Sequence, residues 1–377
     1  MSGCRWFSCL FVALLPCLAS AASMDLAKPV AAFLKESGAP GVAISVLERG
    51  QDKPRTLARG LACVENSVPM RPDSVMKLGS VTKVFTGLRI RMLIEEGKLS
   101  EDMPLSRFFP EQVRGEEITI RHLLTHTSGL PEMLRLEPFA SNMARPWMPQ
   151  EIAAMVSRLP LDFEPGSAQQ YSNSNYLMLG RIVEIVTGEP FDREIEQRIA
   201  KPLGMRHLQP GDDETVLNRA ACGYTNGPQG ELKRPMMASM IPPMATGNLI
   251  GTSEDIVRLV NQGRLVRQNL IDSPPEGPWL LADGSPAVKP EHFPAQGLEF
   301  EQSLLEGMSL FRFSDRPLSL VGKDGMFPGF AAWFLYDART RTAVAVVTNL
   351  ETKAMEAMQL GVRVLEAQRR AKAAKSR

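Results

Sequence analysis

The sequence predicts an α+β fold in which one antiparallel sheet, built from both ends of the chain, is flanked by helices and carries a mainly helical lobe. Two observations support this prediction. Runs rich in β-branched and aromatic residues lie at about 41–64 and again at about 318–350 of the 377 residues. Between about 80 and 267 the apolar residues follow helical spacing instead. A cleft between the two lobes is the expected place for a site.

The strands near the N-terminus are expected in "GVAISVLERG" and "RTLARGLACV". Helices are expected in "ITIRHLLTHT", "PQEIAAMVSRL", "NYLMLGRIVEIVTG" and "TSEDIVRLVNQG". Strands return in "LSLVGKDG", "AAWFLYDA" and "TAVAVVTNL", the last two joined by the hairpin "YDARTRT", and a helix closes the chain. We therefore assign the sheet lobe to about 25–75 and 300–370 and the helical lobe to about 80–267, with a Pro- and Gly-rich excursion at 270–300 and a basic tail at 371–377.

The first residues are typical of a secretory signal. One cation, Arg5, precedes an apolar stretch from Trp6 to Ala19, and Ala19-Ser20-Ala21 offers a small-residue cleavage site. A lipid anchor at Cys17 is the alternative, although Pro16 directly before it fits a lipoprotein signal poorly. We expect residues 1–21 to be removed, leaving a domain at 22–370 that is exported, periplasmic or secreted, with no membrane span.

Composition excludes several functional classes. The formal net charge of +1 leaves no electrostatic footprint for nucleic acid. With four histidines and neither a C-x-x-C nor an H-E-x-x-H motif, we expect no metal and no cofactor. Cys63 and Cys222 remain after signal removal; they form a disulfide or are two isolated small apolar residues, and the sequence favours neither.

The chain contains two S-x-x-K pairs, Ser74 with Lys77 and Ser80 with Lys83. Ser74 follows a Pro-Asp dipeptide in an irregular segment, whereas Ser80 follows Gly79 and precedes an unbroken helix-forming run. A serine in the first turn of a helix has an unpaired backbone N–H, and a lysine three residues later lies on the same face. Nucleophile, base and oxyanion donor are therefore expected together at Ser80.

Two further motifs follow in order. "YSNSNY" places Tyr171 and Asn173 at a loop-to-helix junction. The same Y-x-N spacing recurs at Tyr224, but there the Asn-Gly that follows indicates a hairpin turn. "VGKDG" places Lys323 and Gly325 at the end of a C-terminal strand, a pattern with little meaning by itself.

Taken in this order, the three motifs resemble those of the penicillin-recognising serine hydrolases, which include class C β-lactamases, low-molecular-weight penicillin-binding proteins, D-aminopeptidases and related esterases. The resemblance runs from about Gly41 to Asn349 and includes "ITIRHLLTHTSGLPE", "GNLIGTSEDIVRLV" and "FPGFAAWFLYD". It implies Ser80 as nucleophile, Lys83 as proton acceptor and Tyr171 as second acid/base. It further implies the following substrate-binding set: Asn173 for the acyl-side amide, Lys323 and Gly325 of the third motif, and the backbone N–H groups of Ser80 and Met326 as the oxyanion hole.

These roles require shifted pKa values, because lysine and tyrosine both titrate near pH 10. Two lysines around one phenol should favour phenolate and disfavour the second ammonium. Two other classes remain open. In a Ser-His-Asp hydrolase His126 would act near Ser128, although no G-x-S-x-G occurs. A non-catalytic homologue that binds cell-wall peptide or serves as a scaffold would usually have lost motif residues.

The substrate is expected to be a small molecule or peptide, including cell-wall fragments, and its chemistry depends on two features. Asp324 stands where the family has threonine, and its charge should disfavour substrates with a carboxylate unless strand alternation turns it into solvent. That favours a peptidase or esterase over an efficient β-lactamase. Met236, Met237, Met240 and Met244 either line the cleft or fill the core under a long loop.

Overall fold

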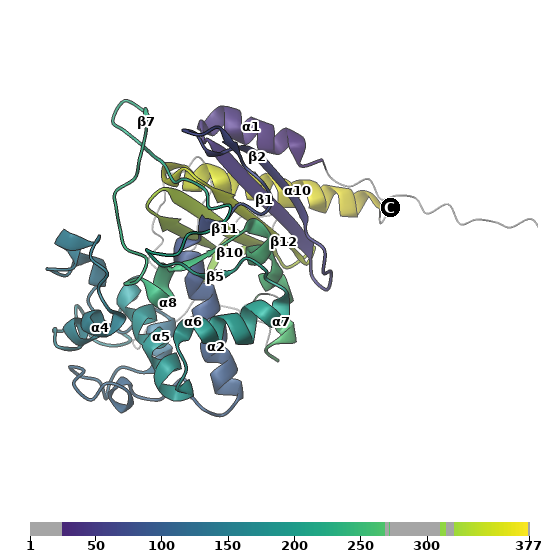
Figure 1. The fold of residues 1–377 in the computed structure, drawn as a ribbon. Coiled ribbons are helices and arrows are strands. Elements are labelled where there is room, and N and C mark those ends of the chain that lie inside the picture. Colours follow the sequence, from purple (N-terminus) through teal and green to yellow (C-terminus); the bar gives the residue numbers. More distant parts are fainter. Residues whose placement is uncertain (1–24, 268–270, 272–309, 314–319, 376–377) are drawn as a thin grey trace, which may run out of the picture.

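The computed structural model describes residues 25–267, 271, 310–313 and 320–375. Its centre is a seven-stranded antiparallel sheet that joins the two ends of the chain, as predicted (Figure 1). The N-terminal β1 lies beside the C-terminal β12, with Ser45 opposite Ala345. In spatial order the strands are β3 (Val68–Pro69), β2 (Arg55–Cys63), β1 (Gly41–Glu48), β12 (Thr342–Thr348), β11 (Phe330–Asp337), β10 (Leu320–Phe327) and β9 (Phe311–Phe313).

Both faces of this sheet are covered, which explains why its central strands read as continuous apolar runs. On one face, Ile44 and Val46 pack with Val30 and Phe33 of α1 (Ala27–Ser37) and with α10 (Ala354–Lys375) (Figure 1). The other face turns Ala43 and its neighbours toward the helical part of the chain. The closing helix α10 was predicted; α1, an eleven-residue helix on the same face, was not.

Between the two halves of the sheet the chain is mainly helical, as expected. The helices are α2 (Thr82–Glu95), α3 (Ile120–Leu124), α4 (Pro149–Ser157), α5 (Asn173–Thr187), α6 (Phe191–Ile195), α7 (Lys201–Leu203), α8 (Met244–Gly247) and α9 (Ser253–Val257). Short segments of 3₁₀ or π helix add η1 (Gly79–Val81), η2 (Leu105–Arg107), η3 (Met133–Arg135), η4 (Ala140–Asn142), η5 (Glu196–Ala200), η6 (Arg258–Arg264) and η7 (Glu351–Lys353). None of the helices in the described ranges combines the length and apolar character needed to cross a bilayer.

Two small sheets within this region were not predicted. One contains β4 (Met76–Lys77), β8 (Leu249–Gly251) and β5 (Gln209–Pro210); the other is a hairpin of β6 (Thr225–Asn226) and β7 (Leu232–Lys233). Strands of two or three residues are too short to show alternation, so the sequence carries no periodic signal for them. The hairpin confirms the turn interpretation of the second Y-x-N motif. Most of the Pro- and Gly-rich stretch at 270–300 lies outside the described residues.

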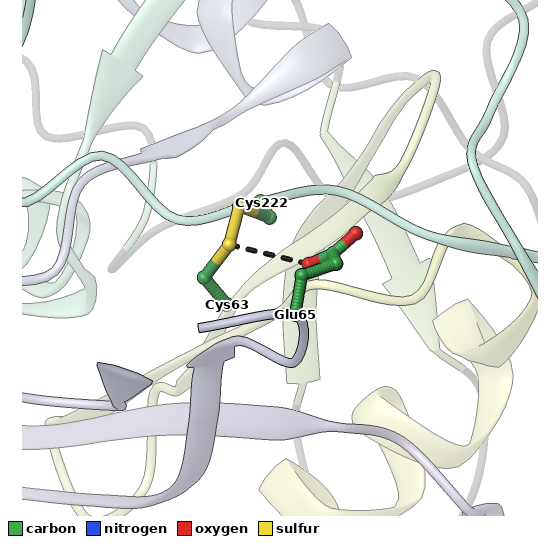
Figure 2. Close-up of side chains that lie close together, drawn as sticks. All are labelled: Cys63, Glu65 and Cys222. Atoms are coloured by element: carbon green, nitrogen blue, oxygen red, sulfur yellow. Dashed lines mark hydrogen bonds between the residues drawn. A yellow bond between two sulfur atoms is a disulfide. The ribbon is translucent and has the colours of Figure 1, made fainter. Parts of the chain in front are cut away.

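Cys63 and Cys222 form a disulfide, which resolves the alternative that the sequence left open (Figure 2). The bond ties β2 to the segment before β6, across 159 residues of sequence. Close by, the Glu65 carboxylate accepts a hydrogen bond from the Tyr224 hydroxyl at 2.5 Å and lies 3.3 Å from the Cys63 sulfur. Because both sulfurs are used in the disulfide, this group offers no thiolate to a metal ion.

Replacing both cysteines, Cys63→Ser with Cys222→Ser, should lower the free energy of unfolding by roughly 2–4 kcal/mol. The closed loop is long, and its cross-link removes conformational entropy from the unfolded chain. Urea unfolding of the oxidised protein and the double variant measures the difference. Treatment with a reductant should lower the unfolding midpoint of the native protein and leave that of the variant unchanged. Equal midpoints for the native protein and the variant would contradict a stabilising role for this bond.

Candidate active site

Ser80 lies in η1, the turn that leads into α2, and the conformation of this turn depends on Gly79. Gly79 has φ of +52°, and a Cβ at this position would approach the backbone nitrogen of Met326 to 2.6 Å. A Cβ on Gly325 would likewise overlap the carbonyl oxygen of Leu78. The backbone of β10 therefore lies directly against the serine turn. This contact gives the K-x-G motif its physical meaning, because only glycine leaves room for it.

Lys83 projects from the first turn of α2 into a fully buried position. Its Nζ lies 3.1 Å from Ser80 Oγ, 2.7 Å from Asn173 Oδ1 and 2.8 Å from the carbonyl oxygen of Thr246. Burial, and then the neighbouring Lys323 ammonium, hold the pKa of Lys83 well below its ordinary value. A neutral amine has two protons and one lone pair. If the two protons go to Asn173 Oδ1 and the Thr246 carbonyl oxygen, which can only accept, the lone pair faces the serine hydroxyl.

Tyr171 completes a directed chain of hydrogen bonds. Its hydroxyl donates to Ser80 Oγ at 2.8 Å, so the serine proton is left to point toward the Lys83 amine. The Nζ atoms of Lys83 and Lys323 lie 4.9 Å and 5.3 Å from the centre of the Tyr171 ring. The three motifs are thus brought together around one hydroxyl group.

The expected direction of the Tyr171 pKa was wrong. Burial raises the pKa of this phenol well above its ordinary value, and the Asp324 and Glu132 carboxylates raise it further. The hydrogen bond to Ser80 acts in the opposite direction without overcoming burial. The prediction considered only the two lysines, because neither the burial of Tyr171 nor the nearby carboxylates can be inferred from the sequence. Tyr171 therefore stays protonated at neutral pH and acts as a donor, while the predicted loss of basicity at Lys83 is confirmed.

Glu132 is a site residue that sequence reasoning missed. Its carboxylate accepts hydrogen bonds from the Asn173 backbone N–H at 2.6 Å and from the Asn173 side-chain amide at 3.1 Å. These bonds fix the amide so that Oδ1, not Nδ2, faces Lys83. The available signal was the final residue of "THTSGLPE", a stretch that was used only for its resemblance. Binding of a substrate amide by Asn173 stays a prediction.

His126 supports the site from behind. Its ring lies between those of Tyr171 and Tyr176, with centroids 4.7 Å and 5.1 Å away. Nδ1 lies 3.2 Å from the Ser172 N–H that donates to it. Burial, and then the two site lysines, hold the pKa of His126 well below its ordinary value, so the ring is neutral. Ser128 is buried with its hydroxyl bonded to Asn175, which makes it inaccessible to a substrate and does not support a Ser-His-Asp site.

The third motif differs from its expected form in one respect. Lys323 is buried on β10, and its Nζ lies 2.5 Å from the carboxylate of the adjacent Asp324. The alternative in which strand alternation turns Asp324 away into solvent is therefore wrong.

Met326, three residues after Lys323, is 57% exposed and lines the catalytic pocket together with Ser80. The oxyanion role of its N–H stays a prediction.

The pocket in front of Ser80 has a volume of about 150 Å³ and mostly apolar walls, including Met133, Phe139 and Phe327. The competing serine, Ser74, is buried elsewhere and accepts a hydrogen bond from the Arg71 N–H at 3.0 Å, as a turn residue does. Among the four methionines, Met244 packs against α5 in the core, so a cleft role for it is wrong. The other three line a second cavity beside the pocket.

The sheet, the helical region and the Ser80–Lys83–Tyr171 cluster together define the class of penicillin-recognising serine hydrolases. The chain belongs to the Beta-lactamase family, whose model matches residues 26–369.

Among curated relatives, the chain is 37% identical over 179 residues to the esterase EstB of Burkholderia gladioli, covering 44% of this chain and 45% of that protein. It is 31% identical over 187 residues to a putative D-alanyl-D-alanine carboxypeptidase of Escherichia coli, covering 44% of this chain and 39% of that protein. The chain thus spans less than half the length of either relative. The D-amino acid amidase of Ochrobactrum anthropi in complex with D-phenylalanine superimposes with a TM-score of 0.76 and 25% identity, covering 92% of this chain and 100% of that one.

Ser80→Ala should abolish turnover of any substrate and labelling by a fluorescent phosphonate. Lys83→Ala should slow acylation at least ~10²-fold, the low end for loss of a general base. Single-turnover kinetics and gel fluorescence measure the two effects. Ser74→Ala is the matched control and should leave the chemistry intact. Near-normal acylation in Lys83→Ala would contradict the assignment of the base.

The acid side of the pH–rate profile should report Lys83, because only its deprotonated form accepts the serine proton. The Asp324 carboxylate raises the Lys83 pKa, so Asp324→Asn should lower that pKa and move the acid limb of kcat/KM to lower pH. Profiles with a neutral p-nitrophenyl ester measure the shift. Asp52→Asn removes an exposed carboxylate that pairs with Arg264 and should leave the limb in place. A shift to higher pH would contradict the assignment.

Proposed function

We propose that this protein is a serine hydrolase that cleaves esters or amides through an acyl-Ser80 intermediate and prefers substrates without a carboxylate near the scissile bond. The observation that carries the proposal is the hydrogen-bond geometry that places Ser80 Oγ between the Tyr171 hydroxyl and Lys83 Nζ. The lowered pKa of Lys83 favours its neutral form, which the proposal requires. A serine hydroxyl is a poor nucleophile unless an adjacent base takes its proton. Here that base is fixed by two acceptors and lies within hydrogen-bond reach.

The acylation step follows from this geometry. Ser80 Oγ attacks the substrate carbonyl carbon while Lys83 takes the hydroxyl proton and becomes an ammonium. The backbone N–H groups of Ser80 and Met326 are proposed to stabilise the oxyanion. Tyr171, held protonated by burial, gives its proton to the leaving group and becomes a phenolate between two lysines. The carbon–leaving-group bond breaks, and the acyl group remains on Ser80.

Deacylation restores the starting protonation state of each residue. The Tyr171 phenolate takes a proton from the attacking water, whose oxygen forms the new bond to the acyl carbon. The bond to Ser80 Oγ breaks, and the serine recovers its proton from the Lys83 ammonium. The net reaction consumes one water and releases an acid and the leaving group. Both residues are again neutral, ready for the next substrate.

The preference against carboxylates rests on Lys323 and Asp324. The Lys323 ammonium already holds a carboxylate at 2.5 Å, so a substrate carboxylate would have to displace Asp324 or lie beside it. Two like charges ~4 Å apart in a partly exposed site repel by on the order of a few kcal/mol. The relatives are named for an esterase, a carboxypeptidase and an amidase; among these chemistries the ion pair favours uncharged esters and amides.

We further propose that the protein acts outside the cytoplasm, in the periplasm or after secretion. The secretory pattern predicted at residues 1–21 supports this location, and the Cys63–Cys222 disulfide suits an oxidising compartment. Fractionation of cells that express the tagged full chain tests the proposal. Retention of the unprocessed chain in the cytoplasm would contradict it.

Purified protein should hydrolyse p-nitrophenyl esters faster than nitrocefin, which carries a carboxylate. Asp324→Thr should raise the nitrocefin-to-ester ratio of kcat/KM about tenfold, because the repulsive charge is removed. Steady-state assays of both substrates measure the ratio, with Asp52→Thr as a matched exposed control. Nitrocefin turnover above the ester rates in the native protein would overturn the preference. Absence of both turnover and Ser80 labelling would favour a non-catalytic binding protein.

A further inference from the structure

A second cavity of about 880 Å³ adjoins the catalytic pocket. Ala238, Ser239 and Pro328 line both spaces, so the two lie next to each other across these residues. The pocket at Ser80, about 150 Å³, holds little more than the reacting group of a substrate. The larger cavity falls in the size range of sites that enclose whole small-molecule ligands.

The walls of this larger cavity are mainly apolar. Met76, Ile250 and Phe330 line it from the small sheet and β11, and Met240 closes one side. At its edge Met236 and Met237 are 58% and 83% exposed, so these flexible side chains face open solvent without core packing. Methionines of this kind adapt to apolar ligands of varied shape. The lining is suited to an extended apolar group.

Of the two cations in this lining, Lys77 lies toward the catalytic pocket. The Lys77 Nζ lies 4.5 Å above the ring of Phe327, a residue that also lines the catalytic pocket. Within the described part of the chain no residue forms an ion pair with Lys77 or accepts a hydrogen bond from it. The Asp213 carboxylate acts on Lys77 as a counter-charge, but its hydrogen bonds come from the Ser239 hydroxyl and the Met240 N–H. The Lys77 ammonium is therefore available to donate hydrogen bonds at the junction of the two cavities.

The charges around the cavity favour a neutral partner for Lys77. Asp212, Asp213 and Glu214 all line the same space. The other cation in the lining, Arg234, is paired with Glu65 at 2.8 Å. An anionic ligand would meet three carboxylates and one unpaired ammonium, whereas a ketone, ether or hydroxyl oxygen would accept from Lys77 without that repulsion.

We propose that the larger cavity binds an extended, mainly apolar group of the substrate, with a neutral acceptor oxygen that receives a hydrogen bond from Lys77. The inference rests on the proposed hydrolase function and specifies its substrate class. Because the cavity adjoins the catalytic pocket along one shared wall, it receives either the acyl or the leaving-group side of the ester. Lengthening the chain on that side alone should improve turnover.

Two ester series test this: p-nitrophenyl acetate against octanoate, and ethyl against octyl acetate. In one of the two series kcat/KM should rise at least ~10-fold from the short to the long chain. Burial of each additional methylene can raise kcat/KM about fourfold at most. Ala144→Trp introduces bulk from an exposed position that lines only the larger cavity and should cut this gain at least threefold. Ala31→Trp, at an exposed position of α1, is the matched control and should preserve the gain with chain length. Equal phosphonate labelling of Ser80 in both variants shows that each has folded.

Lys77 is tested in the responsive series with an eight-carbon chain and the same chain carrying a mid-chain ketone. The native protein should favour the ketone at least threefold, and Lys77→Met should lose that advantage while keeping the gain with chain length. A gain in neither series, or a gain that Ala144→Trp leaves intact, would overturn the cavity assignment. A ketone advantage that persists in Lys77→Met would overturn the role of Lys77. Absence of all ester turnover and of labelling at Ser80 would instead overturn the hydrolase function beneath the inference.

Discussion

The site depends on the close approach of two backbones, the turn before α2 and the end of β10. Side chains at Gly79 or Gly325 would occupy the space in which the two segments meet. This approach brings a strand of the sheet against the first turn of a helix from the other part of the molecule. Ser80, the proposed nucleophile on one segment, and the buried Lys323 on the other are thereby held in one place. Rigid elements hold reacting groups in position better than loops can.

The enclosed environment then shifts the pKa values of Lys83 and Tyr171, whose ordinary values are similar, in opposite directions. Burial acts in opposite senses on an amine and a phenol, because it disfavours the charged form of each. Burial lowers the pKa of Lys83 and raises that of Tyr171. In the proposed scheme, one enclosed environment therefore supplies a proton acceptor and a proton donor on either side of Ser80, with no metal required.

The sheet, its construction from both chain ends, and the choice of Ser80 over Ser74 could all be predicted from the sequence. That choice followed from Gly79 and the helix behind it, both local features. Glu132 was missed because its partner Asn173 lies 41 residues away and no spacing rule connects them. The phenol pKa was misjudged for a related reason, since enclosure is a property of the assembled fold. The pairing of Asp324 with its neighbour likewise depended on a rotamer that strand alternation does not determine.

The pairing of β1 with β12 also constrains the order of events in folding. Residues 41–48 have their central partner at 342–348, so no N-terminal portion of the chain can close the sheet on its own. Contacts so distant in sequence carry a large loop-closure entropy and form slowly. During synthesis β1 can pair with β2 early, but it can pair with β12 only after nearly the whole chain has emerged. Until then the sheet is incomplete, so the chain remains accessible to chaperones or to a translocation channel for most of its elongation.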